Sequence, residues 1–154
     1  MKRIISVILA CIILISIGSG GLVSAANEML LEDISLEEVF EPFSSDFLSS
    51  YGGSISRVSS GNLRVNFTVR ATRIFANVGA LTITIQERNG NSWSSVATYS
   101  HSTTSGMMGS NTSSHSGIVN HSGTAGIEYR ATITVFAGGS PGDQRSFVTN
   151  TVRA

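Results

Sequence analysis

From residue 54 onward, apolar and polar residues alternate along the chain with a period of two. Residues 63–70 alternate without a slip, and the pattern returns in residues 81–86 and 129–135. Successive side chains of a β-strand point to opposite faces of a sheet, so this period predicts strands with one buried and one solvated face. The many Val, Ile and Thr residues at these positions support the prediction.

Turn residues separate these segments at short intervals. Asn89-Gly90 lies between two apolar runs and predicts a hairpin. A turn rich in Gly at residues 138–143 precedes a last strand predicted over residues 146–152, and a short first strand is predicted over residues 54–58. Six or seven strands at this spacing are typical of a β-sandwich.

The inward positions of these strands predict one hydrophobic core. The large apolar residues that we expect in it are Leu63, Val65, Phe67, Val69, Leu81, Ile83, Ile85, Trp93, Ile133, Val135 and Val148. Burial stabilises each by roughly 1.5–3 kcal/mol, so this set is enough for a single core.

The segment from His101 to Ser116 interrupts this regularity. It is rich in Ser, Thr and Gly, and Met107-Met108 is its only apolar point. Two interpretations stay open, a long loop or an edge strand poor in core residues. The methionine pair either fills one end of the core or forms an exposed, adaptable contact surface.

The N-terminus has the features of a secretory signal peptide. Lys2 and Arg3 precede an apolar run over residues 4–17, and the small residues at 23–25 form a cleavage site. The run is shorter than the roughly 20 residues of a membrane span. We therefore expect a secreted, extracellular protein with no stable membrane anchor after cleavage; an uncleaved anchor is the alternative. The single cysteine, Cys11, leaves with the signal, so the mature chain has no disulfide.

Charge is unevenly distributed along the mature chain. Residues 27–50 hold seven acidic residues and no basic one, whereas residues 51–154 hold eight arginines and three acidic residues, a net charge of +5. The chain therefore divides into a signal peptide (1–25), an acidic leader and linker (26–53) and a β-sandwich domain (54–154).

The acidic leader contains one helix signal. Ser35 and Glu38 form a capping box, and Pro42 ends the short helix that we expect near residues 36–41. The leader is either a solvated spacer or a segment that docks, as a donor strand or as a mask over the arginines, on its own domain or on a partner. The apolar residues that would dock are Leu36, Val39, Phe40, Phe43 and Phe47.

Residues 126–139, Gly-Ile-Glu-Tyr-Arg-Ala-Thr-Ile-Thr-Val-Phe-Ala-Gly-Gly, resemble the last hairpin of a fibronectin type III or related immunoglobulin-like domain. The resemblance implies an antiparallel immunoglobulin-like β-sandwich of six to eight strands. It also implies a tyrosine corner, in which the Tyr129 hydroxyl bonds to upstream backbone. The first half of the domain lacks a Trp on the second strand, so a jelly roll is the alternative.

The layout as a whole also resembles a group of small secreted proteins of Gram-positive bacteria that have no assigned function. The shared features are the signal, the acidic leader, a Gln…Trp…Val hairpin and a Gly…Tyr-Arg strand. The residues that carry them here are Gln86, Trp93, Val96, Gly126, Tyr129 and Arg130. This resemblance implies an extracellular bacterial protein and no particular activity.

The sequence does not predict a catalytic centre. Glu87 and Glu128 would form the carboxylate pair of a glycosidase only if their strands are neighbours. No Gly-x-Ser-x-Gly nucleophile elbow is present. The spacing of His101, His115 and His121 matches no compact zinc motif. We therefore expect a non-enzymatic protein without cofactor or metal.

The candidate binding residues are arginines and aromatic residues of the strand segments. Guanidinium groups suit carboxylates and phosphates, and Trp or Tyr rings stack on sugars if they are exposed. Trp93 is also expected in the core or over the hairpin. The candidates are Arg64, Arg70, Arg88, Arg130, Trp93 and Tyr99.

These observations favour a secreted, non-enzymatic binding or structural module that acts at the cell surface. Its candidate partners are a cell-wall polymer, a polysaccharide, another surface protein or a second copy of the chain. Overall neutrality gives no basic field for nucleic acid. The alternative is an enzyme acting on cell-wall or extracellular polysaccharide, or its accessory carbohydrate-binding module.

Overall fold

The computed structural model describes residues 45–154, and each of its seven regular elements is a β-strand in an antiparallel sheet. The strands are β1 (Leu48–Ser59), β2 (Asn62–Asn89), β3 (Ser92–Ser100), β4 (Met108–Ser122), β5 (Glu128–Gly138), β6 (Gly142–Val148) and β7 (Val152–Arg153). The all-β prediction is confirmed. The predicted signal peptide and leader helix lie outside the described residues. Within residues 45–154, no helix is long and apolar enough to cross a membrane.

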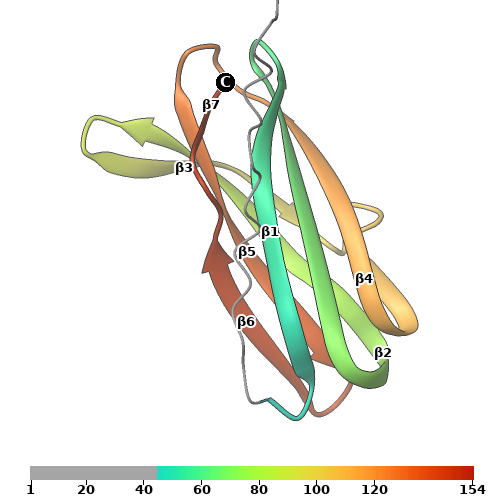
Figure 1. The fold of residues 1–154 in the computed structure, drawn as a ribbon. Coiled ribbons are helices and arrows are strands. Elements are labelled where there is room, and N and C mark those ends of the chain that lie inside the picture. Colours follow the sequence, from blue (N-terminus) through green and yellow to red (C-terminus); the bar gives the residue numbers. More distant parts are fainter. Residues whose placement is uncertain (1–44) are drawn as a thin grey trace, which may run out of the picture. The chain divides into compact units, whose positions relative to one another are not determined.

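Strand β2 belongs to both parts of the sheet. Its first half, residues 62–70, pairs with β1 along one edge and with β4 along the other. Its second half, residues 77–89, pairs with β5 and β3, and its first residues still pair with β4. Between Arg70 and Phe75 the register shifts, and there β2 bends so that its two ends lie toward the same end of the sheet (Figure 1).

The bend makes a curled half-barrel of what the sequence predicted as two stacked sheets. We expected separate strands over residues 63–70 and 81–86, but no proline interrupts the residues between them and the strand continues. One continuous sheet of seven strands results, and β1 comes to lie against β5 across the interior. A Cβ on Gly53 would lie only 3.1 Å from Cδ1 of Ile133, so glycine lets these strands approach closely.

One hydrophobic core fills the interior and receives residues from both halves of β2. The predicted inward positions of residues 63–69 and 83–85 are fully buried. The largest buried side chains are Tyr51, Tyr129, Phe67, Leu48, Ile55, Leu63, Ile83, Ile85, Met107, Ile133, Val65 and Val69. The alternation in the sequence therefore predicted most of the core correctly.

Besides Trp93, two predicted core residues, Leu81 and Val148, lie elsewhere, because the strand register differs. Leu81 lies at a register shift in the pairing of β2 with β5, where the inward place goes to Ala80. Val148 is 44% exposed. Strand β6 pairs Phe147 with Ile133, so Phe147 occupies the buried position that we expected for Val148.

Two predicted strand boundaries are also wrong. Strand β1 begins at Leu48 instead of Ser54, and the residues between them, predicted as linker, pair with β2. The predicted last strand over residues 146–152 is divided into β6 and β7. The turn before it is shorter than predicted and ends at Pro141, so β6 begins earlier.

Strand β4 decides between the two interpretations of the segment rich in Ser, Thr and Gly. Residues 101–107 form turns, and β4 then pairs along its whole length with β2 alone, as an edge strand. Met107 is fully buried, so it fills the core and does not form an exposed contact surface. A strand with few apolar residues is stable here because Met107, Val119 and its hydrogen bonds to β2 anchor it.

Residues after β6 close the outer edge of β1. The side-chain amide of Asn150 accepts a hydrogen bond from the Ile55 N–H and donates one to the Ile55 carbonyl, both at 3.0 Å. At Ile55, the Asn150 amide thus makes the two backbone hydrogen bonds that a neighbouring strand would make, and it covers the outer edge of β1. Nearby, the Phe147 ring packs on Tyr51 with 5.3 Å between ring centres.

Phe47 is the one predicted docking residue of the leader that lies in the described part of the chain. Its ring centre is 5.3 Å from that of Phe75, and its carbonyl accepts a hydrogen bond from the Thr72 N–H at 3.0 Å. Phe47 therefore packs on its own domain, next to the bend of β2.

Candidate functional site

Three of the six candidate binding residues meet on the solvated face of the second half of β2. The register places Trp93 opposite Arg88 and Arg130 opposite Gln86. The guanidinium carbon of Arg130 lies 4.4 Å from the centre of the Trp93 ring, and that of Arg88 lies 5.3 Å from it. Both distances are those of cation–π contacts. We call Arg88, Trp93 and Arg130 the Arg–Trp cluster.

Both arginines of the Arg–Trp cluster are held through one nitrogen each. Arg130 Nε donates to Gln86 Oε1 at 2.8 Å, and Arg88 Nε donates to the Gly90 carbonyl at 2.8 Å. Within residues 45–154 the ion pairs are those of Arg145 with Asp143 (2.7 Å) and Arg153 with Glu128 (3.6 Å). The two guanidinium charges of the cluster therefore have no carboxylate partner in the described part of the chain.

The hairpin between β2 and β3 positions Trp93. A hairpin forms here, as predicted, and its two turn residues are Gly90 and Asn91, between the paired Asn89 and Ser92. Gly90 has a φ of 59°, a value that glycine adopts readily. Trp93 is not in the core, one of its two expected places; it is half-buried on the solvated face of the hairpin, because it lies opposite Arg88. The two guanidinium groups lie over its ring, and it does not belong to the hydrophobic core.

Tyr99 does not join Trp93 in a common surface. It lies opposite the buried Ile83 and therefore points to the core side of the sheet, whereas Trp93 points to the solvated side. The Tyr99 hydroxyl is bonded to Nδ1 of His121 at 3.0 Å and donates to the Asn120 carbonyl at 3.3 Å. The two aromatic candidates thus lie on opposite faces and cannot form one sugar-stacking platform.

Tyr129 closes the core at the end where β2 begins and ends. Its hydroxyl accepts a hydrogen bond from the Thr124 N–H at 2.9 Å and donates to Glu87 Oε2 at 3.2 Å. The expected bond from this hydroxyl to backbone upstream of the tyrosine is therefore present. An added Cβ on Gly123 would lie 2.7 Å from the Tyr129 ring, so this turn needs a glycine.

His121 lies between the two tyrosines. Its ring centre is 6.2 Å from that of Tyr99 and 6.1 Å from that of Tyr129. Burial lowers the pKa of His121, and the nearby Glu87 carboxylate acts in the opposite direction. The imidazole is therefore more readily neutral than that of a solvated histidine.

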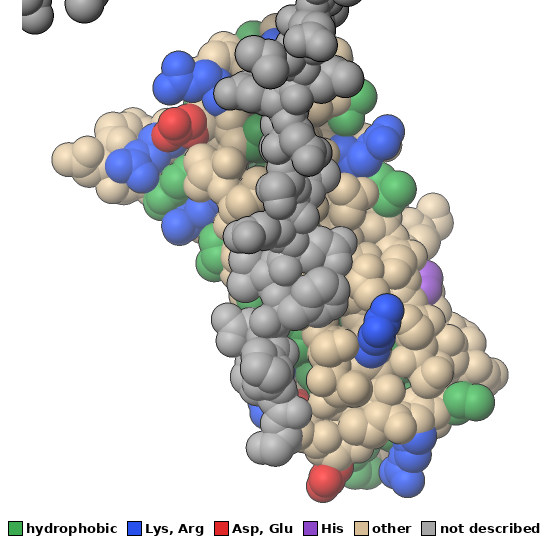
Figure 2. All heavy atoms as spheres, in the orientation of Figure 1, with side chains coloured by type: hydrophobic (Ala, Val, Ile, Leu, Met, Phe, Trp, Pro, Cys, Tyr) green, Lys and Arg blue, Asp and Glu red, His purple; other side chains and the backbone are tan. Residues whose placement is uncertain are grey.

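Arg64 and Arg70 lie on the first half of β2, and the structure does not bring them together. Arg70 is exposed, and its two cross-strand neighbours are Ser50 and Ser114. Arg64 donates through Nε to Asn120 Oδ1 at 3.4 Å. Figure 2 shows basic side chains gathered where the β3 hairpin leaves the sheet, and others standing singly among uncharged residues.

The residues considered for other chemistry are separated from one another. Glu87 lies opposite Tyr129 on the paired strands β2 and β5, so Glu128, one residue away, points to the other face of the sheet. Among residues 45–154, no three His, Cys, Asp or Glu side chains are grouped as a metal site would require.

Gln86 and Asn120 contribute to these arrangements but were not among the predicted binding residues. Gln86 is two residues from Arg88, so the period of two places it on the same face and could have identified it. Asn120 meets Arg64 through the pairing of β4 with β2. No short-range signal in the sequence indicates that pairing.

Comparison of the chain with protein family models, with curated proteins and with solved structures found no match.

Proposed function

We propose that this protein is a secreted, non-enzymatic binding module that holds anionic groups of a cell-wall or extracellular polymer. The observation that carries the proposal is the Arg–Trp cluster, in which one indole holds two guanidinium groups side by side. Each guanidinium uses Nε within the protein, so its terminal nitrogens are available to a carboxylate or a phosphate.

The surroundings of the cluster favour a polymer over a small substrate. The face continues from the cluster along β2, β3, β5 and β6 as rows of hydroxyl groups, including Thr84 with Thr98 (3.2 Å) and Thr134 with Ser146 (2.8 Å). A hydroxyl-lined sheet face suits an extended chain that contacts it at several points, and the Arg–Trp cluster would supply the charged contact.

The signal-like N-terminus supports secretion, and it is part of this proposal. We also infer that the domain is a curled relative of the immunoglobulin-like sandwich. The bond of the Tyr129 hydroxyl to upstream backbone and the packing of β1 against β5 support that kinship.

Retention on insoluble cell walls and on immobilised acidic polysaccharide, at low and at high salt, tests the proposed function. We expect the purified protein to be retained at low salt and released at high salt, because salt screens exposed charges. The double variant Arg88→Gln/Arg130→Gln should bind at least about tenfold more weakly, since a hydrogen bond to a charged group contributes about 1.5–3 kcal/mol.

Arg70→Gln is the matched control, because Arg70 is an exposed arginine of the same strand outside the cluster. Equal binding by the double variant and the control would refute the proposal. Retention that resists salt and is lost in Trp93→Ala alone would instead favour the alternative, a carbohydrate-binding module that stacks sugars on the indole.

A further inference from the structure

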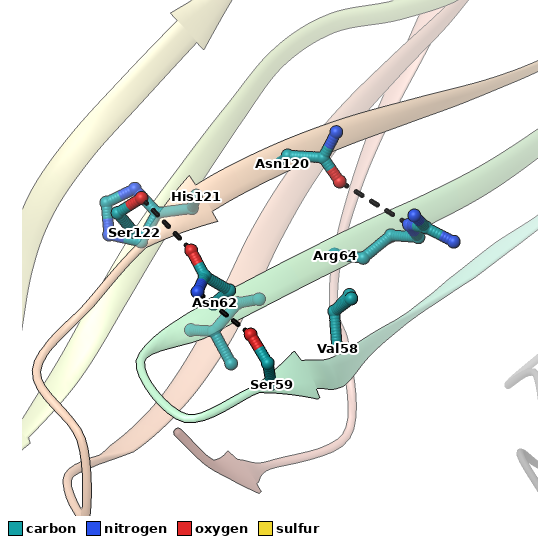
Figure 3. A pocket seen from close by; sticks show the side chains of 8 residues that line it. Val58, Ser59, Asn62, Arg64, Asn120, His121 and Ser122 are labelled. Carbon is teal, nitrogen blue, oxygen red and sulfur yellow. Dashed lines mark hydrogen bonds between the residues drawn. The ribbon is translucent and has the colours of Figure 1, made fainter.

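A small polar pocket lies at the end of the sheet where β1 turns into β2 and β4 ends. It has a volume of about 320 Å³, at the lower end of the range of small-molecule sites. Its lining residues are Val58, Ser59, Asn62, Leu63, Arg64, Asn120, His121 and Ser122 (Figure 3). None of them belongs to the Arg–Trp cluster, so an inference from this pocket does not depend on the proposed function.

Hydrogen bonds within the lining fix one side of the pocket. Asn62 Nδ2 donates to Ser59 Oγ at 2.9 Å, and Ser122 Oγ donates to Asn62 Oδ1 at 3.4 Å. These bonds join the β1–β2 turn to the end of β4 (Figure 3). The amide and hydroxyl groups are therefore held in place before any ligand arrives, which lowers the entropic cost of binding.

Arg64 and Asn120 form the opposite side. Arg64 Nε donates to Asn120 Oδ1 at 3.4 Å, and the Asn120 carbonyl accepts a bond from Tyr99 at 3.3 Å. Within residues 45–154, the terminal nitrogens of Arg64 and the amide nitrogen of Asn120 make no hydrogen bond. These are the groups that face a ligand with unused donors.

The charge of the lining is positive. Arg64 is its only permanently charged residue, no carboxylate lines the pocket, and burial favours the neutral form of His121. Val58, which is 55% exposed, adds an apolar surface beside these donors. A guanidinium, two amides, two hydroxyls and one exposed apolar side chain match the anionic group, the hydroxyl groups and the C–H face of an acidic sugar.

We propose that this pocket binds one sugar unit of the uronic acid type, with its carboxylate on Arg64 and its ring against Val58. The volume limits the ligand to about one ring, since the pocket is at the small end of known ligand sites. The pocket is open to one side, so the unit could be the end of a polysaccharide or a free monosaccharide.

Titration of the full purified protein with three probes, followed by NMR of its backbone amides, tests this assignment. The probes are glucuronate, glucose and acetate, which separate the sugar ring from the carboxylate. We expect glucuronate to shift the amides of residues 58–64 and 120–122 saturably, and to bind at least about tenfold more tightly than glucose or acetate, because each lacks one set of contacts.

Arg64→Gln should weaken glucuronate binding about tenfold, to the affinity of glucose, whereas Arg70→Gln should bind as the unchanged protein does. Both arginines are exposed residues of the same face of β2, so neither change should affect folding. Binding of glucose or acetate as tight as that of glucuronate would overturn the proposal, as would unchanged binding by Arg64→Gln or no saturable shift with any probe. Shifts confined to residues 86–93 and 130 would assign the sugar to the Arg–Trp cluster and would refute the proposal that this pocket binds it.

Discussion

The two halves of β2 have the same alternation and share one core, but their solvated faces differ. In the first half, Arg64 and Arg70 lie apart among Ser, Thr and Asn, and the three strands of that part carry no acidic residue. In the second half, Arg88 and Arg130 meet at Trp93, and acidic residues lie on the same strands.

The difference shows what turns ordinary strand arginines into a potential site. Each half presents two of the four candidate arginines from a polar strand face, so the number of candidates does not distinguish the halves. An aromatic ring that two neighbouring strands can reach brings the guanidinium groups together and offsets part of their mutual repulsion through cation–π contacts. Without such a ring, Arg64 and Arg70 act singly.

The largest expected effect tests whether the halves fold as one unit. Phe67 belongs to the first half and is 1% exposed. We expect Phe67→Ala to reduce the free energy of unfolding by about 3–5 kcal/mol. Trp93, the only tryptophan, lies in the second half, so its fluorescence and the far-UV circular dichroism should show the same shifted denaturant midpoint.

Ile118→Ala is the control for this change, because Ile118 lies on the neighbouring strand but is 57% exposed; it should alter stability by less than about 0.5 kcal/mol. If Phe67→Ala shifted the dichroism midpoint and left that of Trp93 in place, the halves would be separate folding units and the shared core would not couple them.

A smaller effect is expected where residues after β6 hold β1. Asn150→Ala removes both hydrogen bonds to Ile55 and should cost about 1–3 kcal/mol, because the backbone groups of this buried residue lose their partner. Hydrogen exchange of the Ile55 amide, which donates one of these bonds, should accelerate by the corresponding factor, about 5- to 150-fold.

Asn91→Ala, an exposed asparagine in the β2–β3 hairpin, provides the comparison and should leave the Ile55 amide unchanged. If the Ile55 amide exchanged as slowly in Asn150→Ala as in the unchanged protein, the contact with residue 150 would contribute nothing to the stability of the β1 edge.

The smallest effect concerns His121, which packs where strands of both halves meet. Its pKa in the folded protein is lower than in the unfolded chain, where it is about 6.5. As pH falls below about 6.5, the unfolded chain takes up the proton first, so the free energy of unfolding decreases until the folded pKa is passed. Well above about pH 6.5, His121 is neutral in both states and should not contribute to the pH dependence of stability.

Urea unfolding between about pH 7.5 and pH 5.5 measures this slope, and the range avoids the titration of ordinary carboxyl groups. His121→Gln should flatten the slope, whereas His101→Gln, a change at an exposed turn residue, should keep it. An equal slope in all three proteins would show that His121 titrates alike in the folded and unfolded states.

Much of the fold could be predicted because strand faces follow from local alternation. The period of two in residues 63–70 and 129–135 identified the buried positions, and Asn89-Gly90 identified the hairpin. The course of β2 could not be predicted, because a bend in a continuous strand leaves no proline or glycine pair as a signal. Val148 was misplaced for a related reason, since the register of β6 depends on where its turn ends.

Prediction of the candidate site succeeded for residue types and failed for their grouping. Arginines at solvated strand positions were identifiable from the sequence, whereas Trp93 was also expected in the core, and three of the candidates do meet. That Tyr99 points to the other face depends on its pairing with Ile83 across the hairpin. Which strand carries the partner of Arg64 depends on long-range pairing, and local pattern does not encode that.

The bend of β2 also determines where this chain can change in length during evolution. In a paired strand, one inserted residue turns every following side chain to the opposite face. Residues 73 and 74 have no cross-strand partner on β1, β4 or β5, and Ile74 is 69% exposed. An insertion or deletion there can be absorbed before pairing resumes at Phe75. Related chains should therefore tolerate length differences at this bend and keep the numbers of residues on either side of it constant.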